Sequence, residues 1–598
     1  MVETDFYYLP DECWECIFMF LNDDDRDRRY LKSLSLVSKR FLFLTNRVRL
    51  TLKFRHPTVG FISRYFQRFP NLTSLDLSYC FNSTTLNNLL RNISAFPLNI
   101  TSLNLSNQIF PSDGLRYFSQ NITTLTSLKC SNMLSISNTD LLLIADCFPL
   151  LQQLDLSNPA IFDYNTLSGI HRNTYFREAV EALSLTLSKL QRINLSAHYY
   201  MNNRLLFHLF KNCKFLKEAI IFDCYLITIN GIALAICERP TLTSLSLLRS
   251  SERGCQVIVR SITPRFVKSL ASLKGLTSLD LSSLNISDEL LSSIAMEGLP
   301  LRKLVLRNCT GYSYDGIFRL LSKCPCIQHL DLQYTRFLED NQHLTDQRLV
   351  QLSSFLGHLI SINLNHCRKL TESALFALAR SCPLLSEIKM EYTLIGKESA
   401  ENSNHPMNYL VYPQLKSLRL ANNYWLRDEN IIMFASIFPN LQMFDWSQCD
   451  LISKGIFFQV IKRCRNIRHL NLVSNAEVNL MNLLRMNFEA PKLEVLNLSH
   501  TDVICGTLYV ISKNCRGLLH LLLRCCPGVT EVGVNIVLEN CTQLREIDLW
   551  GCYQVNSNVV SSMISSRPSL RKIIAPPGFD LKDIKKKRLF LYQGCFIC

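Results

Sequence analysis

Residues 518–552 read LLHLLLRCCPGVTEVGVNIVLENCTQLREIDLWGC and hold one copy of a repeat followed by the start of the next. The copy opens with Leu518, Leu521 and Leu523 in an L-x-x-L-x-L pattern, whose last step is the period-2 alternation of a strand. Apolar residues then recur at the spacing of one helix face, at Val534, Val537, Leu538 and Cys541. The strand pattern begins again at Leu544, 26 residues after Leu518. A strand and a helix that recur at a fixed period predict a solenoid.

The same pattern runs through almost the whole chain. It begins at nineteen positions: Leu72, Ile100, Leu125, Leu151, Leu190, Leu216, Leu242, Leu276, Leu301, Ile327, Leu359, Leu385, Leu415, Leu441, Ile467, Leu493, Leu518, Leu544 and Leu570. Thirteen of the eighteen spacings are 25 or 26 residues, so stacked repeats account for a chain of 598 residues. The predicted fold is α/β, a right-handed horseshoe with a parallel inner sheet and outer helices. We assign residues 47–575, about 19 to 20 repeats, to this solenoid.

Most of the 24 cysteines fit the repeat. Thirteen occupy two fixed places, three residues before a repeat start or eight residues after it: Cys213, Cys324, Cys382, Cys464, Cys515 and Cys541, and Cys80, Cys224, Cys309, Cys367, Cys449, Cys526 and Cys552. Fixed places predict small buried hydrophobic groups rather than a disulfide framework. The first residues show no signal-peptide pattern, so we expect a reduced compartment, either the cytoplasm, the nucleus or both.

Charge and motifs exclude several classes of function. The net charge of +15 is scattered along the chain, with one dense run at Lys585–Arg588, so we expect no nucleic-acid surface. No H-E-x-x-H, G-x-S-x-G or P-loop pattern is present. The cysteine pairs Cys324–Cys326 and Cys525–Cys526 lack a second pair at zinc spacing. We therefore predict a non-catalytic chain without a metal or a cofactor.

Residues 1–46 do not follow the repeat. Leu9-Pro10-Asp11-Glu12 predicts a helix start, because proline suits a first turn and acidic side chains favour its positive end. Two apolar stripes at helical spacing follow, on either side of a charged break at residues 22–29. So short a segment is too small to be stable alone. It is either a cap on the solenoid or a docking module whose apolar face a partner completes.

The stretches LPDECWECIFMFL (residues 9–21) and LKSLSLVSKRFLFLTN (residues 31–46) resemble an F-box. The resemblance implies binding to a Skp-type adaptor within a cullin ubiquitin ligase. Eight residues match adaptor-facing or core positions of the family: Leu9, Pro10, Ile17, Phe18, Leu21, Leu34, Val37 and Phe41. Cys13 departs from the pattern, because the family usually has a larger aliphatic residue there. Residues 370–390, LTESALFALARSCPLLSEIKM, resemble the cysteine-containing subclass of leucine-rich repeat that commonly follows an F-box.

Within each repeat, the second, fourth and sixth places after the start point to the inner face of the sheet. The large or charged residues there are the predicted substrate-binding residues: Lys303, Arg307, His329, Lys389, His469, His520, Arg524 and Trp550. Trp550 beside Arg524 has the composition of a binding hot spot, although a self-contained cation–π pair is the alternative. Hormone receptors of the family hold an inositol phosphate on this face, but the basic residues here are spread over many repeats.

Long spacings and the tail add further expectations. Extra residues at 158–176, 249–264, 336–343 and 396–406 predict looped-out insertions, which either serve binding or are tolerated drift in loop length. The basic tail, residues 576–598, ends in Cys595-Phe596-Ile597-Cys598, which has the C-a-a-X form behind Lys585–Arg588. That form makes Cys595 a candidate for prenylation, with membrane contact only if it occurs, although the terminal Cys598 is not among the usual residues at the last place of the motif. An ordinary frayed terminus is the alternative.

Together these features predict the substrate receptor of an SCF-type ubiquitin ligase. Residues 1–46 would hold the adaptor and the ligase core, and the inner face of the solenoid would hold an unknown protein substrate. Two alternatives stay open. One is a leucine-rich repeat scaffold or inhibitor without a ubiquitin role, and the other is a small-molecule sensor of the hormone-receptor kind.

Overall fold

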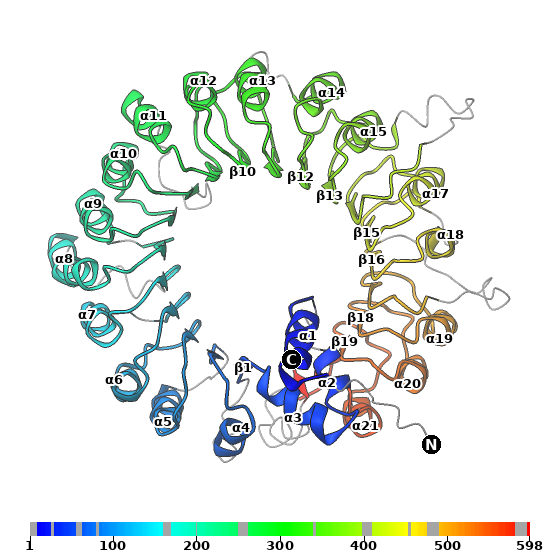
Figure 1. Cartoon of the computed structure of the whole chain (residues 1–598). Coiled ribbons are helices and arrows are strands. Elements are labelled where there is room, and N and C mark those ends of the chain that lie inside the picture. The colour runs from blue at the N-terminus through cyan, green and yellow to red at the C-terminus, as the bar shows by residue number, and fades with distance from the viewer. Residues whose placement is uncertain are drawn as a thin grey trace, which may run out of the picture. The chain divides into compact units, whose positions relative to one another are not determined.

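The computed structural model divides the chain into two compact units, Met1–Leu276 and Thr277–Cys598. It describes residues 9–24, 29–54, 62–78, 83–134, 136–159, 169–198, 200–248, 261–338, 343–397, 410–452, 456–474, 490–580 and 595–598. In each unit the strands lie side by side on one face, and the helices lie behind them (Figure 1). No helix in these ranges is long and apolar enough to cross a membrane.

Three helices form the N-terminal module: α1 (Asp11–Asp24), α2 (Arg29–Leu34) and α3 (Lys39–Arg47). Helix α1 begins directly after Pro10, and Asp11 and Glu12 occupy its first turn, where the helix dipole favours negative charge. Ser38 caps α3, because its hydroxyl accepts a hydrogen bond of 3.0 Å from the backbone N–H of Phe41. The helix start predicted at Leu9–Glu12 is therefore confirmed.

The rest of the first unit repeats strand and helix. Its strands are β1 (Thr51–Lys53), β2 (Ser74–Asp76), β3 (Ser102–Asn104), β4 (Ser127–Lys129), β5 (Gln153–Asp155), β6 (Arg192–Asn194), β7 (Glu218–Phe222) and β8 (Ser244–Leu248). Its helices are α4 (Ile62–Arg68), α5 (Ser83–Ser94), α6 (Ser112–Asn121), α7 (Asn138–Cys147), α8 (Gly169–Thr186), α9 (Asn203–Asn212), α10 (Ile229–Cys237) and α11 (Pro264–Ala271). Residues 47–54, RVRLTLKF, alternate in polarity and predict a strand, but only Thr51–Lys53 form β1, because α3 extends to Arg47 and Val48 is its C-cap.

The second unit continues the alternation. Its strands are β9 (Ser278–Asp280), β10 (Lys303–Val305), β11 (His329–Asp331), β12 (Ser361–Asn363), β13 (Glu387–Lys389), β14 (Ser417–Arg419), β15 (Met443–Asp445), β16 (His469–Asn471), β17 (Val495–Asn497), β18 (His520–Leu522), β19 (Glu546–Asp548), β20 (Lys572–Ile574) and β21 (Phe596–Ile597). Its helices are α12 (Asp288–Met296), α13 (Tyr314–Lys323), α14 (Asp346–Ser353), α15 (Glu372–Ser381), α17 (Asp428–Ile437), α18 (Ile456–Arg463), α19 (Cys505–Asn514), α20 (Glu531–Asn540) and α21 (Val559–Ser566).

Neighbouring strands within each unit pair in parallel, and equivalent places of successive repeats face each other. Leu304 of β10 lies between Leu279 of β9 and Leu330 of β11, and all three side chains are buried. Because every repeat puts its leucines at the same level, the side chains form a continuous core between strands and helices. The predicted solenoid of parallel strands and packed helices, preceded by a small helical module, is confirmed.

The repeat also explains the cysteines. Every cysteine of the two fixed places is buried as predicted, except Cys80, which lies outside the described residues. Cysteines eight residues after a repeat start donate their S–H to a leucine carbonyl of the preceding repeat, as in Cys309 to Leu281 and Cys552 to Leu523, both at 2.9 Å. Burial raises the pKa of both thiols to about 12, so they stay protonated donors.

Most of the predicted insertions fall outside the described residues, namely at 160–168, 249–260, 339–342 and 398–409. The same holds for the basic run 585–588. The end of the tail is described, and it forms β21, which pairs in parallel with β20. The N–H of Phe596 donates to the carbonyl of Arg571 at 2.8 Å, and the N–H of Cys598 donates to Ile573 at 3.0 Å. The last residues therefore extend the sheet of the second unit.

Candidate functional site

The N-terminal module separates the eight predicted adaptor-binding residues into two groups. Phe18 is fully buried and forms a core with Leu31, Leu44 and Val48. Leu34 and Phe41 pack against this core together with Trp14, and Leu21 is half-buried. Leu9, Pro10, Ile17 and Val37 are exposed. The buried group holds the three helices together, and the exposed group is available to a partner; whether an adaptor contacts it stays a prediction.

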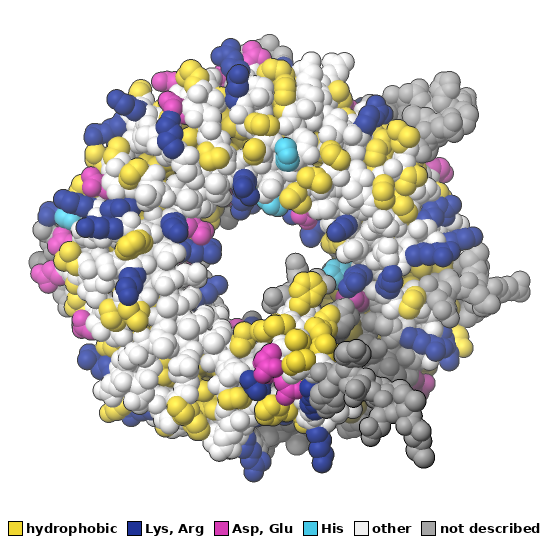
Figure 2. Space-filling view, in the orientation of Figure 1, with side chains coloured by type: hydrophobic (Ala, Val, Ile, Leu, Met, Phe, Trp, Pro, Cys, Tyr) yellow, Lys and Arg dark blue, Asp and Glu magenta, His cyan; other side chains and the backbone are white. Residues whose placement is uncertain are grey.

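Exposed apolar side chains that the sequence pattern did not single out enlarge this surface. Leu36 is 80% exposed and Phe20 is 78% exposed, beside Val37 at 65%. Hydrophobic side chains gather over the N-terminal helices in Figure 2. Phe20 lies outside the apolar stripe that the helical spacing predicts, and the helix packing shows that Phe20 and Leu36 are exposed whereas Phe18 is buried. We call Leu9, Ile17, Phe20, Leu36 and Val37 the module face.

Two ion pairs fasten α1 to α3. The guanidinium of Arg40 donates to a carboxylate oxygen of Asp11, with Nε at 2.7 Å, and to the carbonyl of Leu9 at 3.0 Å. Arg47 lies 2.8 Å from the carboxylate of Glu15. These contacts hold the Leu9-Pro10 segment against α3, so the apolar residues of α1 keep a fixed position beside the turn that carries Leu36 and Val37.

All eight predicted substrate-binding residues lie on strands, or directly after them, in the second unit. Parallel pairing places Lys303 of β10 directly beside His329 of β11, and both are exposed. Arg307, which lies in the turn after β10, is exposed as well. Lys389 lies 3.4 Å from Glu387 of its own strand. His469 is exposed on β16. These residues share the strand face but are divided among separate strands, so they form several small groups rather than one site.

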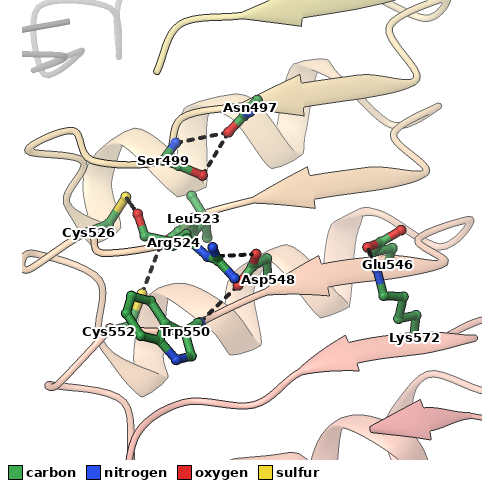
Figure 3. Close-up of polar contacts among 10 residues, drawn as sticks. All are labelled: Asn497, Ser499, Leu523, Arg524, Cys526, Glu546, Asp548, Trp550, Cys552 and Lys572. Atoms are coloured by element: carbon green, nitrogen blue, oxygen red, sulfur yellow. Dashed lines mark hydrogen bonds and ion pairs between the residues drawn. The ribbon is translucent and has the colours of Figure 1, made fainter. Parts of the chain in front are cut away.

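The last strands bring three charged residues into one row. Register places His520, Glu546 and Lys572 side by side on β18, β19 and β20. Nδ1 of His520 lies 3.1 Å from Oε2 of Glu546, and Nζ of Lys572 donates to Oε1 at 2.5 Å (Figure 3 shows the Lys572 contact). The hydrogen bond from His520, together with Lys572, lowers the pKa of Glu546 to about 2. Glu546 is therefore an anion at neutral pH, held between two donors.

The predicted pair of Arg524 and Trp550 meets in the structure. The guanidinium carbon of Arg524 lies 4.9 Å from the centre of the Trp550 ring, and Nε of Arg524 lies 3.5 Å from Oδ2 of Asp548. Figure 3 shows Arg524 between the ring and the carboxylate. The backbone N–H of Trp550 donates to Oδ1 of Asp548 at 3.0 Å. Burial raises the pKa of Asp548, and these two partners act against that rise.

This arrangement keeps both interpretations of the pair open. Arg524 has an internal anion and an internal ring, as a self-contained pair requires. Trp550 nevertheless stays 53% exposed. Tyr553, three residues further along the chain, is not among the predicted binding residues and is 81% exposed. A rigid, half-exposed Trp held by a neighbouring Arg is the kind of anchor that binding hot spots use.

The basic residues on the described strands do not gather into one anion site. In the second unit Lys389 and Arg524 each face a carboxylate, and in the first unit Arg192 lies 3.3 Å from Glu218. Lys and Arg side chains are scattered over the face drawn in Figure 2. Within the described ranges no group of three or more His, Cys, Asp or Glu side chains could hold a metal ion. The scattered basic residues of the sequence disfavour an inositol phosphate ligand, and that expectation stays a prediction.

The predicted prenylation residue lies inside the fold. Cys595 is only 1% exposed, directly before β21. Burial raises the pKa of its thiol to about 11. Prenyl transfer needs an accessible thiolate, so in this conformation the residue does not present one. Lipidation would require β21 to separate from β20, and it stays a prediction.

Comparison with known proteins supports the N-terminal assignment. The family model described as F-box domain matches residues 6–53. F-box/LRR-repeat protein 4 of Bos taurus is 25% identical over 222 residues, which cover 36% of this chain and 35% of that protein. A transport inhibitor response 1-like protein of Oryza sativa subsp. japonica is 24% identical over 333 residues, covering 52% of this chain and 54% of that protein.

Among solved structures, the yeast Rad7 and Elc1 complex contains a similar chain. It is 17% identical, and the alignment covers 82% of this chain and 98% of that chain at a TM-score of 0.43. An overlap at that TM-score bears neither on function nor on partners. The chain spans 35% and 54% of the lengths of the two curated relatives named above. The name of the Bos taurus protein states an F-box and leucine-rich repeats.

Proposed function

This chain is an F-box leucine-rich repeat protein, and we propose that it serves as the substrate receptor of an SCF-type ubiquitin ligase. The module face would bind a Skp-type adaptor of the cullin ligase core. The strand face of the second unit would hold a protein substrate. The chain itself would make and break no bonds and need no cofactor, because it acts by holding the substrate near a charged ubiquitin-conjugating enzyme.

The observation that carries the proposal is the exposed apolar surface of the N-terminal module. Three short helices bury one small core, yet Phe20, Leu36 and Val37 remain more than half exposed. Large apolar side chains grouped on one small module mark a protein interface rather than a free surface. If the module only capped the solenoid, we would expect these apolar side chains to be buried against the leucines of the first repeats. The compartment that follows from a ubiquitin role is the cytoplasm, the nucleus or both.

The adaptor contact can be tested with charge placed on the module face. We expect Ile17→Asp and Val37→Asp each to weaken binding to a purified Skp-type adaptor by about a hundredfold, because an apolar contact is lost and a carboxylate is buried. Both residues are exposed in the chain alone, so the variants should fold like the parent. Isothermal titration of the full chain with the adaptor gives the dissociation constants.

The matched control is Met296→Asp. Met296 is exposed, like Ile17 and Val37, but it is the last residue of α12 in the second unit. We therefore expect Met296→Asp to leave adaptor binding unchanged. If the parent chain does not bind the adaptor, the receptor function is wrong. If the parent binds but both Asp variants bind equally well, the assignment of the module face is wrong.

The substrate contact can be tested at Arg524 and Trp550. Proximity labelling by the full chain should lose a defined set of proteins in the Arg524→Ala, Trp550→Ala variant, because an exposed aromatic anchor and its cation are removed together. Substrates in that set should also lose ubiquitination in the Val37→Asp variant.

The control uses a second cation–aromatic pair that lies on the helix side. Nζ of Lys513 lies 5.7 Å from the centre of the Tyr509 ring, and both side chains are exposed on α19. The Tyr509→Ala, Lys513→Ala variant should keep the labelling pattern of the parent. Identical losses in both double variants would show that the strand face has no special role.

A further inference from the structure

Three aromatic rings from successive repeats stack on one another in the second unit. The ring centres of Tyr334 and His366 lie 3.9 Å apart, and those of His366 and Tyr392 lie 4.3 Å apart. The ring planes differ by only 12° and 13°. Backbone hydrogen bonds set the spacing, because the N–H of Tyr334 donates to Asn365 and the N–H of His366 donates to Glu391. The rings follow β11, β12 and β13, at the rim beyond the strand ends.

Each ring occupies a backbone position that suits other residues better. The φ angles of Tyr334, His366 and Tyr392 are 58°, 61° and 55°, in the left-handed region that bulky side chains rarely adopt. Eight other described repeats put Asn, Asp or Ser there, namely Asn107, Asn132, Asn158, Asp223, Ser283, Asn308, Asn422 and Ser474, and five more carry Ala197, Gln448, His500, Cys525 and Gly551. Asparagine tolerates this conformation because its short side chain bonds locally. Two tyrosines and a histidine held there together point to a use beyond folding.

The stack presents ring edges rather than ring faces. Both faces of the His366 ring and the inner face of each tyrosine ring are covered within the stack, so these half-buried residues expose mainly ring edges and polar tips there. Ring edges carry the positive end of the aromatic quadrupole. The tyrosine hydroxyls and the imidazole add hydrogen-bond donors. An edge-on stack of this kind favours an anionic partner.

Exposed cations surround the stack. Arg336 follows Tyr334, and Arg368 and Lys369 follow His366, all three exposed. The backbones of Arg336 and His343 form an isolated antiparallel β-bridge. Burial lowers the pKa of His343, and Lys369, Arg336 and Arg368 lower it further, as Arg368 does for His366. Three described carboxylates lie close along the chain: Asp331 three residues before Tyr334, Glu372 three residues after Lys369, and Glu391 directly before Tyr392. Glu339 and Asp340 of the loop lie outside the described residues.

Apolar side chains lie at both ends of this basic region. Leu338 is 65% exposed beside Arg336. At the other end, Trp425 is half-exposed, and its carbonyl lies next to Gly396, in the turn that follows Tyr392. The four repeats involved span roughly 15 Å at the usual strand spacing. An extended segment of about five residues covers that length. The surface thus has an anion-binding centre between two apolar ends.

We propose that the aromatic stack of Tyr334, His366 and Tyr392, with Arg336, Arg368 and Lys369, binds a short acidic peptide segment flanked by apolar side chains. We call these six residues the rim patch. The proposal rests on the proposed receptor function, since it names the kind of substrate segment that the chain would capture. A peptide fits better than a nucleic acid, because three cations between apolar ends match a few carboxylates rather than a long phosphate backbone.

The test measures binding of a labelled Leu-Glu-Glu-Glu-Glu-Leu peptide to the full chain by fluorescence anisotropy. The Arg368→Gln, Lys369→Gln variant should bind about tenfold more weakly, because two of the cations that face the peptide are neutralised. The Tyr334→Asn, Tyr392→Asn variant should also bind more weakly. Asparagine is the residue that neighbouring repeats use at this φ, so the fold should be kept. A lysine-centred peptide should not bind the parent.

The matched control is Arg319→Gln, Lys323→Gln, which removes the same charge from the exposed side of α13. It should leave the dissociation constant within about twofold of the parent. The proposal is overturned if the parent does not bind the peptide, if the rim-patch variants bind normally, or if the α13 variant weakens binding equally. It is also overturned if an oligothymidine of equal charge binds as tightly and depends on the same residues. Adaptor titration of the same preparations separates these outcomes from failure of the receptor function.

Discussion

Among single residues, the one eight positions after a repeat start often supplies a buried hydrogen-bond donor to the preceding repeat. The residue eight positions after a repeat start is a buried cysteine in six described repeats, and its thiol donates to a carbonyl of the preceding repeat. In one repeat this residue is His198, which is fully buried, with Nε2 2.6 Å from the carbonyl of Leu156. Burial lowers the pKa of His198 to about 4, so the imidazole is neutral in the folded chain. It acts as a larger version of the cysteine donor.

His198 should make stability depend on pH. Its pKa is 6.5 when unfolded and about 4 when folded, so between these values the unfolded chain binds the extra proton. The contribution is therefore complete above pH 6.5 and falls as the pH drops toward about 4. The full loss is roughly 3 kcal/mol. We expect the unfolding midpoint of the parent to fall more steeply over this window than that of His198→Cys, in thermal melts at matched pH.

The His198→Cys variant keeps a donor at the place where other repeats carry cysteine. His343, His366 and all carboxylates are unchanged in it, so the difference between the two pH profiles reports His198 alone. Parallel profiles would show that the buried imidazole is not titrated on unfolding.

Among the secondary-structure elements, the short strand β21 changes how the C-terminal C-a-a-X motif is interpreted. The C-a-a-X form predicts an accessible Cys595, whereas β21 pairs with β20 and buries that thiol. The apolar Phe596 and Ile597 that a prenyl-transfer motif requires are also suitable residues for a strand at the end of a sheet. A four-residue motif cannot distinguish these uses, because both depend on the same side chains.

Cys595 should react slowly with a maleimide in the native chain. Its thiol is buried and its pKa is raised to about 11, whereas Cys13, Cys237 and Cys326 are exposed. We expect its labelling, followed by mass spectrometry of the peptides, to be at least about tenfold slower than that of Cys326. Ile597→Asp should unpair β21 and restore the reaction. Equal labelling rates for Cys595 and Cys326 in the parent would contradict the buried position.

At the scale of the whole molecule, stability is a sum of local terms. Each strand pairs only with the strands of adjacent repeats, and the chain divides into two compact units. In such a chain, damage in one repeat is felt by its neighbours and fades with distance along the solenoid. The N-terminal module has a core of its own, formed by Phe18, Leu31, Leu44 and Val48. Substrate and adaptor surfaces can therefore be altered separately.

Leu304→Ala should show this locality. The side chain is fully buried between Leu279 and Leu330, so its truncation should cost about 2 to 5 kcal/mol. Hydrogen exchange should speed up in the repeats of β9, β10 and β11 and stay unchanged in the N-terminal module. Leu384→Ala, at an exposed leucine, is the control and should change nothing. A uniform loss of protection across all 21 strands would contradict the nearest-neighbour picture.

The repeat architecture could be predicted from the sequence because the residues that form it recur at a fixed period. Leucines at fixed intervals predict strand and helix in every copy, and cysteines at fixed places are packing residues for the same reason. Only part of the candidate binding surfaces could be predicted from the sequence. Arg524 and Trp550 were found because both occupy inward places of the strand pattern. Phe20 and Leu36 were missed, because the helices of the N-terminal module have no repeat against which to judge them.

The solenoid, its repeat boundaries, the buried leucines and the match to an F-box all follow from local patterns of residues, because each depends on residues near one another in the chain. Tertiary structure alone decided which surfaces exist. Tyr334, His366 and Tyr392 are 32 and 26 residues apart, and only the parallel register brings their rings within stacking distance. Likewise, only the pairing of β20 with β21 buries Cys595. The physical reason is that a local pattern fixes each repeat, whereas a surface is made from residues that different repeats contribute.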